Sequence, residues 1–192
     1  MFQPLPVTLQ RGALRLEPLV EEDIPGLLEL AEANRESQQY MSGTQRPDWY
    51  RAALADHREG RAVVFVIRLA GELAGITRFF DFMPGLPAAE IGYTWLDSRQ
   101  HGTGLNATVK YLLLRHAFEE WQLVRVQLKT ASSNLRSQRA IEKLGARREG
   151  ELRNHRRLAD GRLDGTVMYS ITDREWPQVK AGLEARFGAA GY

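Results

Sequence analysis

Apolar and polar residues alternate in two different ways along the first sixty residues. In residues 14–18 leucines alternate with charged side chains, a period of two that predicts a half-buried strand. The acidic run 21–23 then precedes apolar positions at helical spacing in residues 24–31, and negative charge favours a helix N-terminus. A polar stretch follows over residues 34–48, and a second short helix is predicted over residues 49–58. The chain therefore starts with a strand and two helices.

The middle of the chain changes to strand patterns. Residues 62–69 form a continuous apolar run rich in β-branched side chains, which is typical of a buried strand. The turn 70–72 joins this run to a second strand over residues 73–82, and a short loop leads to a third strand over residues 89–96. Three strands in succession with short connections predict an antiparallel meander.

From residue 102 onward helices and strands alternate. Gly102 and Gly104 precede a long helix whose apolar positions repeat with the helical period up to Ala117. A last helix follows Thr172 and Glu175, which together form a candidate capping box. The elements between them are a strand over residues 123–128, a helix over 133–144 closed by Gly145, and strands over 147–153 and 167–172. A strand–helix–strand crossover after an antiparallel meander predicts a mixed sheet in an α/β (α+β) fold.

Composition and charge narrow the classes of protein. The 192 residues suffice for one domain over residues 1–192, and 43% hydrophobic with 26% charged residues is ordinary for a globular protein. A net charge of +2 with scattered arginines is too weak for a nucleic-acid-binding face, so no nucleic-acid partner is expected. The lack of cysteine excludes disulfides and thiolate metal sites, and no metal is expected. No signal-peptide pattern or membrane-length apolar stretch occurs, so we expect a cytoplasmic protein without a membrane partner.

The most informative segment runs from residue 96 to residue 106, where a strand gives way to a helix. Backbone N–H groups converge there without partners, and Gly102 and Gly104 let them approach a ligand closely. Oriented N–H groups and the helix dipole favour a phosphate or pyrophosphate. A simple glycine turn that caps the helix would use the same residues, so both interpretations stay open on the glycines alone.

Two nucleotide-binding motifs can be compared with this turn. A P-loop needs a Gly-Lys pair followed by Ser or Thr, and the chain has none. Residues 102–107 do satisfy the dinucleotide fingerprint G-x-G-x-x-[GA], but that fingerprint requires a carboxylate at the end of the next strand. That strand ends in residues 127–130 without one, and antiparallel strands precede the turn. The dinucleotide interpretation is therefore disfavoured.

Several motifs at matching spacing carry a family resemblance. They are Arg99-x-x-Gly102-x-Gly104, Asn134-x-x-Ser137, Glu142-Lys143-Leu144-Gly145, Glu149-Gly150-x-Leu152-Arg153, and Asp164 before Tyr169. The first resembles the [QR]-x-x-G-x-[GA] motif of the GNAT superfamily of acyl-CoA-dependent N-acetyltransferases. The others resemble the RimJ/RimL-like branch, which acetylates ribosomal-protein N-termini. With the order of elements, the resemblance covers residues 14–176.

The resemblance implies the GNAT fold, with a mixed central sheet of about seven strands and helices on both faces. It implies that strands 89–96 and 123–128 splay apart and that the pantetheine arm of acetyl-CoA, the expected co-substrate, lies between them. One backbone N–H there would polarise the thioester carbonyl and so lower the activation barrier of the acyl transfer by about 3 kcal/mol. The residues expected to bind the cofactor are Thr94, Trp95, Leu96, Arg99, Gln100, His101, Gly102, Thr103, Gly104, Leu105, Asn106, Asn134 and Ser137.

The implied reaction is direct attack of a neutral primary amine on the thioester, which agrees with the absence of a cysteine nucleophile. A base must remove a proton from the acceptor ammonium. Glu90, at the start of its strand, is the first candidate for the base, directly or through water. A carboxylate on the wet face of a strand is an equally open interpretation. Glu149 and His155 are weaker candidates.

An acid must return a proton to the departing thiolate. Many members of the superfamily use a tyrosine seven residues after the motif asparagine, but this chain has Ile141 there. Ser137 is the alternative, as a proton relay or a hydrogen-bond donor to the thiolate, although a solvated helix serine would look the same. Asn134 is also a good helix N-cap, a role compatible with touching pantetheine.

The acyl acceptor is the part that the sequence leaves open. The resemblance puts an amine-bearing acceptor, either a protein N-terminus or a small molecule, beside residues 36–50 and 82–87. Aromatic side chains in these stretches could line a pocket or simply cover the core. The competing functional class is a non-catalytic acyl-CoA-binding sensor or subunit, supported by Ile141. The oligomeric state is open, with a homodimer among the alternatives.

Overall fold

One mixed sheet of eight strands organises the computed structural model, which describes residues 4–38, 40–41, 44–158 and 160–187. The strand order is β1-β2-β3-β4-β5-β6-β8-β7. The strands are β1 (Leu9–Arg11), β2 (Leu14–Pro18), β3 (Val63–Leu69), β4 (Glu72–Phe80), β5 (Ala88–Leu96), β6 (Arg125–Ala131), β7 (Arg147–Arg157) and β8 (Leu163–Thr172). The mixed sheet is confirmed. The additional strand is β1, whose three residues are too few to show a period.

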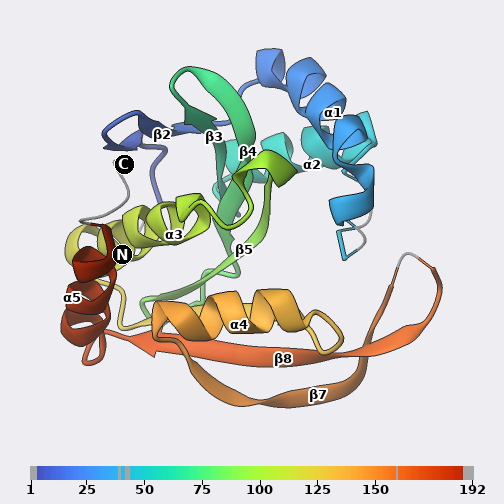
Figure 1. Cartoon of the computed structure of the whole chain (residues 1–192). Helices are drawn as coiled ribbons and strands as arrows, with labels where there is room; N and C mark the ends of the chain where they lie inside the picture. The colour runs from blue at the N-terminus through green and yellow to red at the C-terminus, as the bar shows by residue number, and fades with distance from the viewer. Residues whose placement is uncertain (1–3, 39, 42–43, 159, 188–192) are drawn as a thin grey trace.

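The sheet divides in two at the junction of β5 and β6. All other neighbours are antiparallel, whereas β5 and β6 are parallel and pair only through Ala88–Glu90 and Arg125–Gln127. Beyond these pairs the two strands separate, so β1–β5 and β6–β8 form two wings (Figure 1). The predicted splaying of these strands is confirmed.

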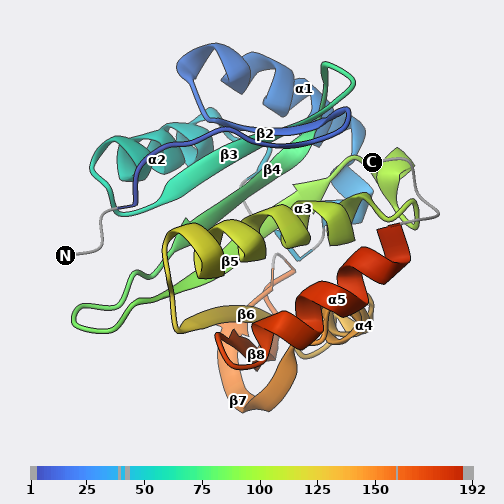
Figure 2. The ribbon, with the colours of Figure 1, turned by 90° about the vertical axis from the view of Figure 1, so that its left-hand side faces the viewer.

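Helices cover both faces of the sheet, as expected. They are α1 (Ile24–Ala33), α2 (Pro47–Arg58), α3 (Leu105–Arg115), α4 (Leu135–Leu144) and α5 (Trp176–Phe187). One apolar core joins α1 and α2 to residues such as Val64 and Ile76, while the other joins α3, α4 and α5 to residues such as Phe65 and Tyr169. Figure 2 shows α1 and α2 on one side of β2–β4 and α3 on the other. Because successive side chains of a strand point to opposite faces of the sheet, one strand can contribute residues to both cores.

Three predicted boundaries were wrong, for identifiable reasons. The strand expected over residues 123–128 runs instead from Arg125 to Ala131, because Leu123 is a buried residue of the connection that follows α3. The last two strands are longer than expected and form a hairpin over residues 147–172. Nearly every β7 side chain is exposed, so no apolar period marks its full length.

Candidate active site

A β-bulge shapes the free edge of β5. The pairing of β4 with β5 shifts register between Ile76 and Arg78, and Tyr93 adopts φ +49°, in the left-handed region. The Arg78 guanidinium lies 3.5 Å from the centre of the Tyr93 ring and supports this conformation. From Ile91 to Leu96 the described residues of β5 have no strand neighbour on the β6 side. The edge therefore faces the space between the two wings with unpaired backbone groups.

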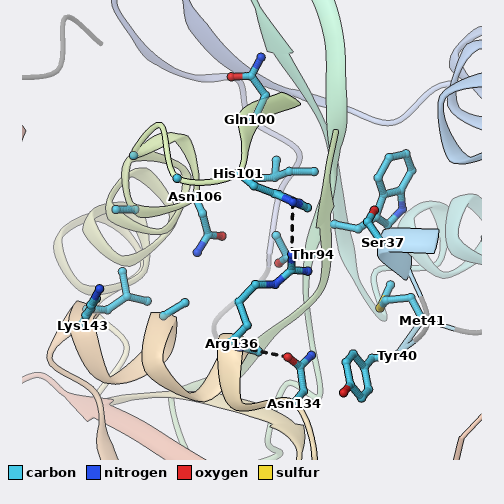
Figure 3. Close-up of a pocket in the computed structure, with 18 of the residues that line it drawn as sticks. Ser37, Tyr40, Met41, Thr94, Gln100, His101, Asn106, Asn134, Arg136 and Lys143 are labelled. Carbon is cyan, nitrogen blue, oxygen red and sulfur yellow. Dashed lines mark hydrogen bonds between the residues drawn. The ribbon is translucent and has the colours of Figure 1, made fainter. Parts of the chain in front are cut away.

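A cavity of about 350 Å³ lies between the end of β5, the following turn and α4 (Figure 3). Its lining residues are Ser37, Tyr40, Met41, Thr94, Trp95, Leu96, Gln100, His101, Gly102, Gly104, Asn106, Ala107, Asn134, Arg136, Ser137, Ala140, Lys143, Leu144 and Arg186. The residues that the sequence analysis placed at the cofactor are thus brought together from β5, the turn, α3 and α4, with three exceptions.

The turn after β5 satisfies some of its backbone donors internally but leaves others, at its glycines and at the start of α3, without an acceptor among the described residues. Gly102 and Gly104 adopt φ +80° and +93°, and a Cβ on either would meet no atom within 4 Å. Among the described residues, no acceptor is found for the N–H groups of Gly102, Gly104, Asn106 and Ala107. Four such donors at the start of an eleven-residue helix make a site for an anionic group.

Three predicted cofactor residues do not line the cavity. The Arg99 side chain binds the Asp97 carboxylate, with Nε 2.8 Å from Oδ2, and this hydrogen bond lowers the pKa of Asp97. The Thr103 hydroxyl donates to the Gln100 carbonyl at 2.9 Å. Leu105 is buried in the core. Arg99 and Thr103 therefore stabilise the turn, and Leu105 anchors the helix that follows it.

Basic side chains around the cavity were missed in the sequence analysis. Arg136 and Lys143 lie seven residues apart on α4, on the same helix face, and Arg186 comes from α5. The helical period of α4 could have indicated the first two, whereas nothing in the sequence places α5 here. Arg136 Nη1 lies 3.2 Å from His101 Nδ1, and burial together with the Arg136 charge lowers the pKa of His101. The cavity rim is therefore positively charged.

A second cavity of about 170 Å³ continues from the first into the space between β5 and β6. The two share lining residues that include Thr94, Asn134 and Ser137. Asn134 caps α4, because its Oδ1 accepts the Ser137 N–H at 3.0 Å, which confirms the N-cap prediction. The Ser137 hydroxyl has no acceptor among the described residues, and Ser137 lines both cavities.

The candidate bases lie away from Ser137. Glu90 is 1% exposed, accepts a hydrogen bond from Gln127 at 2.9 Å and pairs with Lys129 at 3.0 Å, and burial raises its pKa. It lines a separate cavity of about 300 Å³ with the loop after β4. Glu149 binds Arg125, which lowers its pKa to about 2, and His155 lies 3.1 Å from Thr166 Oγ1. Neither lines the two connected cavities.

The family model "Acetyltransferase (GNAT) domain" matches residues 13–147. The chain belongs to the GNAT acetyltransferase family. It is 30% identical over 119 residues to the ribosomal-protein-serine acetyltransferase of Escherichia coli K12, covering 62% of this chain and 66% of that protein. It matches Mycobacterium smegmatis RimJ in complex with CoA-disulfide at TM-score 0.84 and 26% identity, over 97% of each chain. A GCN5-related N-acetyltransferase from Brucella melitensis matches at TM-score 0.84 and 22% identity, over 95% of this chain and 86% of that one, which shows the shared fold.

Membership of this family fixes the class of reaction. The enzyme is an N-acetyltransferase that moves an acetyl group from acetyl-CoA to an amine, as the sequence predicted. Nothing in the comparisons points to a non-catalytic acyl-CoA binder. Within the described ranges, no helix is both long and apolar enough to cross a membrane. The same residues contain no cluster of three or more His, Asp or Glu side chains arranged to hold a metal ion.

Proposed function

We propose that the larger cavity holds acetyl-CoA, with the pyrophosphate on the turn that spans residues 100–106. The N–H groups of Gly102, Gly104, Asn106 and Ala107 support this placement, since they are donors without an acceptor in the described part of the chain. The open space in front of both glycines leaves room for phosphate oxygens close to the backbone. Arg136 and Lys143 add positive charge at the rim.

The pantetheine arm is proposed to run along the free edge of β5 toward the second cavity. Thr94, Trp95 and Leu96 line the larger cavity, and among the described strands their backbone has no neighbour on the β6 side. An extended amide chain that lies there would complete the edge as an additional strand would. The thioester would then lie between β5 and β6, beside Ser137.

Two residues are proposed for proton transfer. Ser137 would donate a hydrogen bond to the departing sulfur, since it lines both cavities and its hydroxyl has no acceptor among the described residues. Glu90 would act as the base through water, because burial raises its pKa and so makes the carboxylate a stronger base, and it lies at the end of β5 that pairs with β6. Replacing Glu90 by Gln should lower kcat/KM and flatten its pH dependence. An unchanged pH–rate profile would exclude Glu90 as the base.

The acceptor is proposed to be a protein N-terminal amine in the cytoplasm. The name of the Escherichia coli relative supports a protein acceptor. An open depression of about 880 Å³ along β7 and β8 supports it as well, because its residue Asp164 accepts a hydrogen bond from Ser133, the neighbour of Asn134 in the two connected cavities. Its lining residues all belong to the hairpin and include Glu151, Arg153 and Asp164. A peptide needs such an extended surface, whereas a small amine does not.

An acceptor panel tests this proposal. Acetyl-CoA is mixed with the enzyme and with peptides that carry a free N-terminus, with the same peptides blocked at the N-terminus but containing lysine, and with small amines, and free thiol is measured. We expect thiol release that depends on the free N-terminus. Turnover on small amines alone would contradict the protein acceptor, and binding of acetyl-CoA without thiol release on any amine would support the sensor instead.

A further inference from the structure

Lys110 on α3 is the one lysine or arginine that is buried among the described residues. Its ammonium group donates to Thr94 Oγ1 at 2.6 Å, and Thr94 Oγ1 lies 2.7 Å from Thr77 Oγ1. It forms no ion pair with a carboxylate of the described chain. Lysine is almost never fully buried without a charged partner, because desolvation of the ammonium is costly. Burial of Lys110 therefore lowers the stability of the fold, and packing alone does not explain why a lysine stands here.

The ammonium group is hydrogen-bonded to Thr94, a residue that lines both connected cavities. Lys110 lines the second cavity together with Ser137, Tyr40 and Ile141. Thr94 and Asn106 line both this cavity and the larger one, so the two cavities adjoin. A buried proton donor thus lies where the proposed path of the thioester arm ends.

The surroundings of Lys110 suit a group that gives up a proton. Burial lowers the pKa of Lys110 to about 7, while the Glu90 charge acts in the opposite direction. The Glu90 carboxylate is itself bound to Lys129 and Gln127, so it does not hold the Lys110 proton. The other titratable or charged side chains that line the cavity are Tyr40, Tyr93, Lys129 and Arg156. Tyr40 donates its hydroxyl hydrogen to the Ser133 carbonyl at 3.2 Å.

We propose that Lys110 is a catalytic residue of the acetyl transfer and supplies the proton that the departing thiolate takes up. This inference rests on the proposed placement of the thioester between β5 and β6. The acceptor nitrogen forms the new C–N bond to the carbonyl carbon, and the C–S bond breaks with its electron pair on sulfur. The Nζ proton passes to that sulfur, which leaves neutral Lys110 and free thiol. The nitrogen releases its surplus proton to water, and Lys110 regains a proton from water.

This assignment accounts for a feature that the family resemblance leaves unexplained. Ile141 is buried at the position where a tyrosine acid would be expected. Ser137 can donate a hydrogen bond, but a serine hydroxyl is a poor acid at neutral pH. Lys110 provides a titratable donor in the same cavity from a different element.

Three variants test the proposal: Lys110→Met, Lys110→Arg and, as a surface control, Lys180→Met. Lys180 lies on α5 and pairs with Glu119. For each we measure kcat with the best acceptor, the Kd of acetyl-CoA by calorimetry, and Tm. Lys110→Met should lower kcat about a hundredfold or more, the usual range for a lost proton-transfer group. Its Kd should change less than threefold, and its Tm should be unchanged or higher, because an unpaired buried charge is removed.

Lys110→Arg separates proton transfer from charge. Arginine keeps the positive charge but cannot be deprotonated, so it should be as inactive as Lys110→Met. Wild-type kcat in Lys110→Arg, a loss below threefold in Lys110→Met, or a loss of acetyl-CoA affinity that accounts for the whole drop would each overturn the proposal. Failure of the wild-type enzyme to bind acetyl-CoA would instead overturn the proposed function. Lys180→Met should match the wild type in all three measurements.

Discussion

At the scale of single residues, the two glycines of the turn carry the strongest claim about ligand binding. Gly104→Ala places a side chain at φ +93° and should lower stability by about 1 kcal/mol. The same substitution at Gly161, which has φ +85° and equally open surroundings in the β7–β8 turn, should cost a similar amount. Only Gly104→Ala should weaken acetyl-CoA binding, by roughly tenfold, since its methyl group enters the space in front of the free N–H groups. Equal affinities measured by calorimetry for the two variants would contradict the phosphate site.

Ser137 gives a second prediction at this scale. A hydrogen bond to a charged group contributes about 1.5–3 kcal/mol, so Ser137→Ala should lower kcat by roughly ten- to a hundredfold with acetyl-CoA affinity nearly unchanged. The steady-state rate of thiol release provides the measurement, with Ser98→Ala as the control, because Ser98 lies outside both cavities. A loss of less than threefold in Ser137→Ala would mean that the hydroxyl has no catalytic role.

Some residues of the site could be placed from the sequence and others could not. The turn and Asn134 could be placed because glycine spacing and helix capping are local properties of the chain. Arg186 and Lys110 could not, since their positions depend on how α5 and α3 pack against distant elements. The motif also did not indicate that the Arg99 side chain binds the Asp97 carboxylate.

At the scale of elements, the hairpin β7–β8 is bound to the rest of the sheet by polar contacts. Arg125 of β6 reaches across β8 to Glu149 of β7, where Ser170 Oγ also donates to the carboxylate at 2.7 Å. Glu149→Gln should lower the free energy of unfolding at pH 7 by about 1 kcal/mol, a value limited by the partial exposure of the pair.

The pKa of Glu149 decides how this loss changes with pH. Because Arg125 lowers the pKa to about 2 from an ordinary 4.5, the stabilisation is present above pH 4.5 and is lost as the pH falls toward 2. Urea unfolding of Glu149→Gln and wild type at pH 7 and pH 3 should show a smaller difference at pH 3. A difference of the same size at both pH values would mean that the ion pair contributes nothing.

Elements differed in how well the sequence predicted them, for a physical reason. β3 and β4 were predicted almost to the residue, because burial on both faces requires continuous apolar runs. The two-residue turn between them was also recognisable from Gly71. β7 was predicted too short, because an edge strand with exposed side chains has no apolar period to mark its end.

At the scale of the whole molecule, the proposed acetyl-CoA site depends on the division of the sheet into two wings. The helices divide by face: α1 and α2 cover one face of the first wing, while α3, α4 and α5 form one core on the other face with strands of both wings. The parallel contact between β5 and β6 over three residue pairs holds the wings together at one end and leaves them apart at the other. The space for the site therefore results from the partial pairing of β5 with β6, and the turn after β5 lines its larger cavity.

Hydrogen exchange of individual backbone amides, followed by NMR with and without acetyl-CoA, tests this central claim most directly. Without ligand, the amides of Gly102, Gly104, Asn106 and Ala107 should exchange rapidly, because no acceptor protects them within the described chain. Acetyl-CoA should slow all four, while the amide of Gly161, bonded to the Leu158 carbonyl in the distant hairpin turn, should keep its rate. Acetyl-CoA that binds without slowing exchange at these four amides would contradict the account.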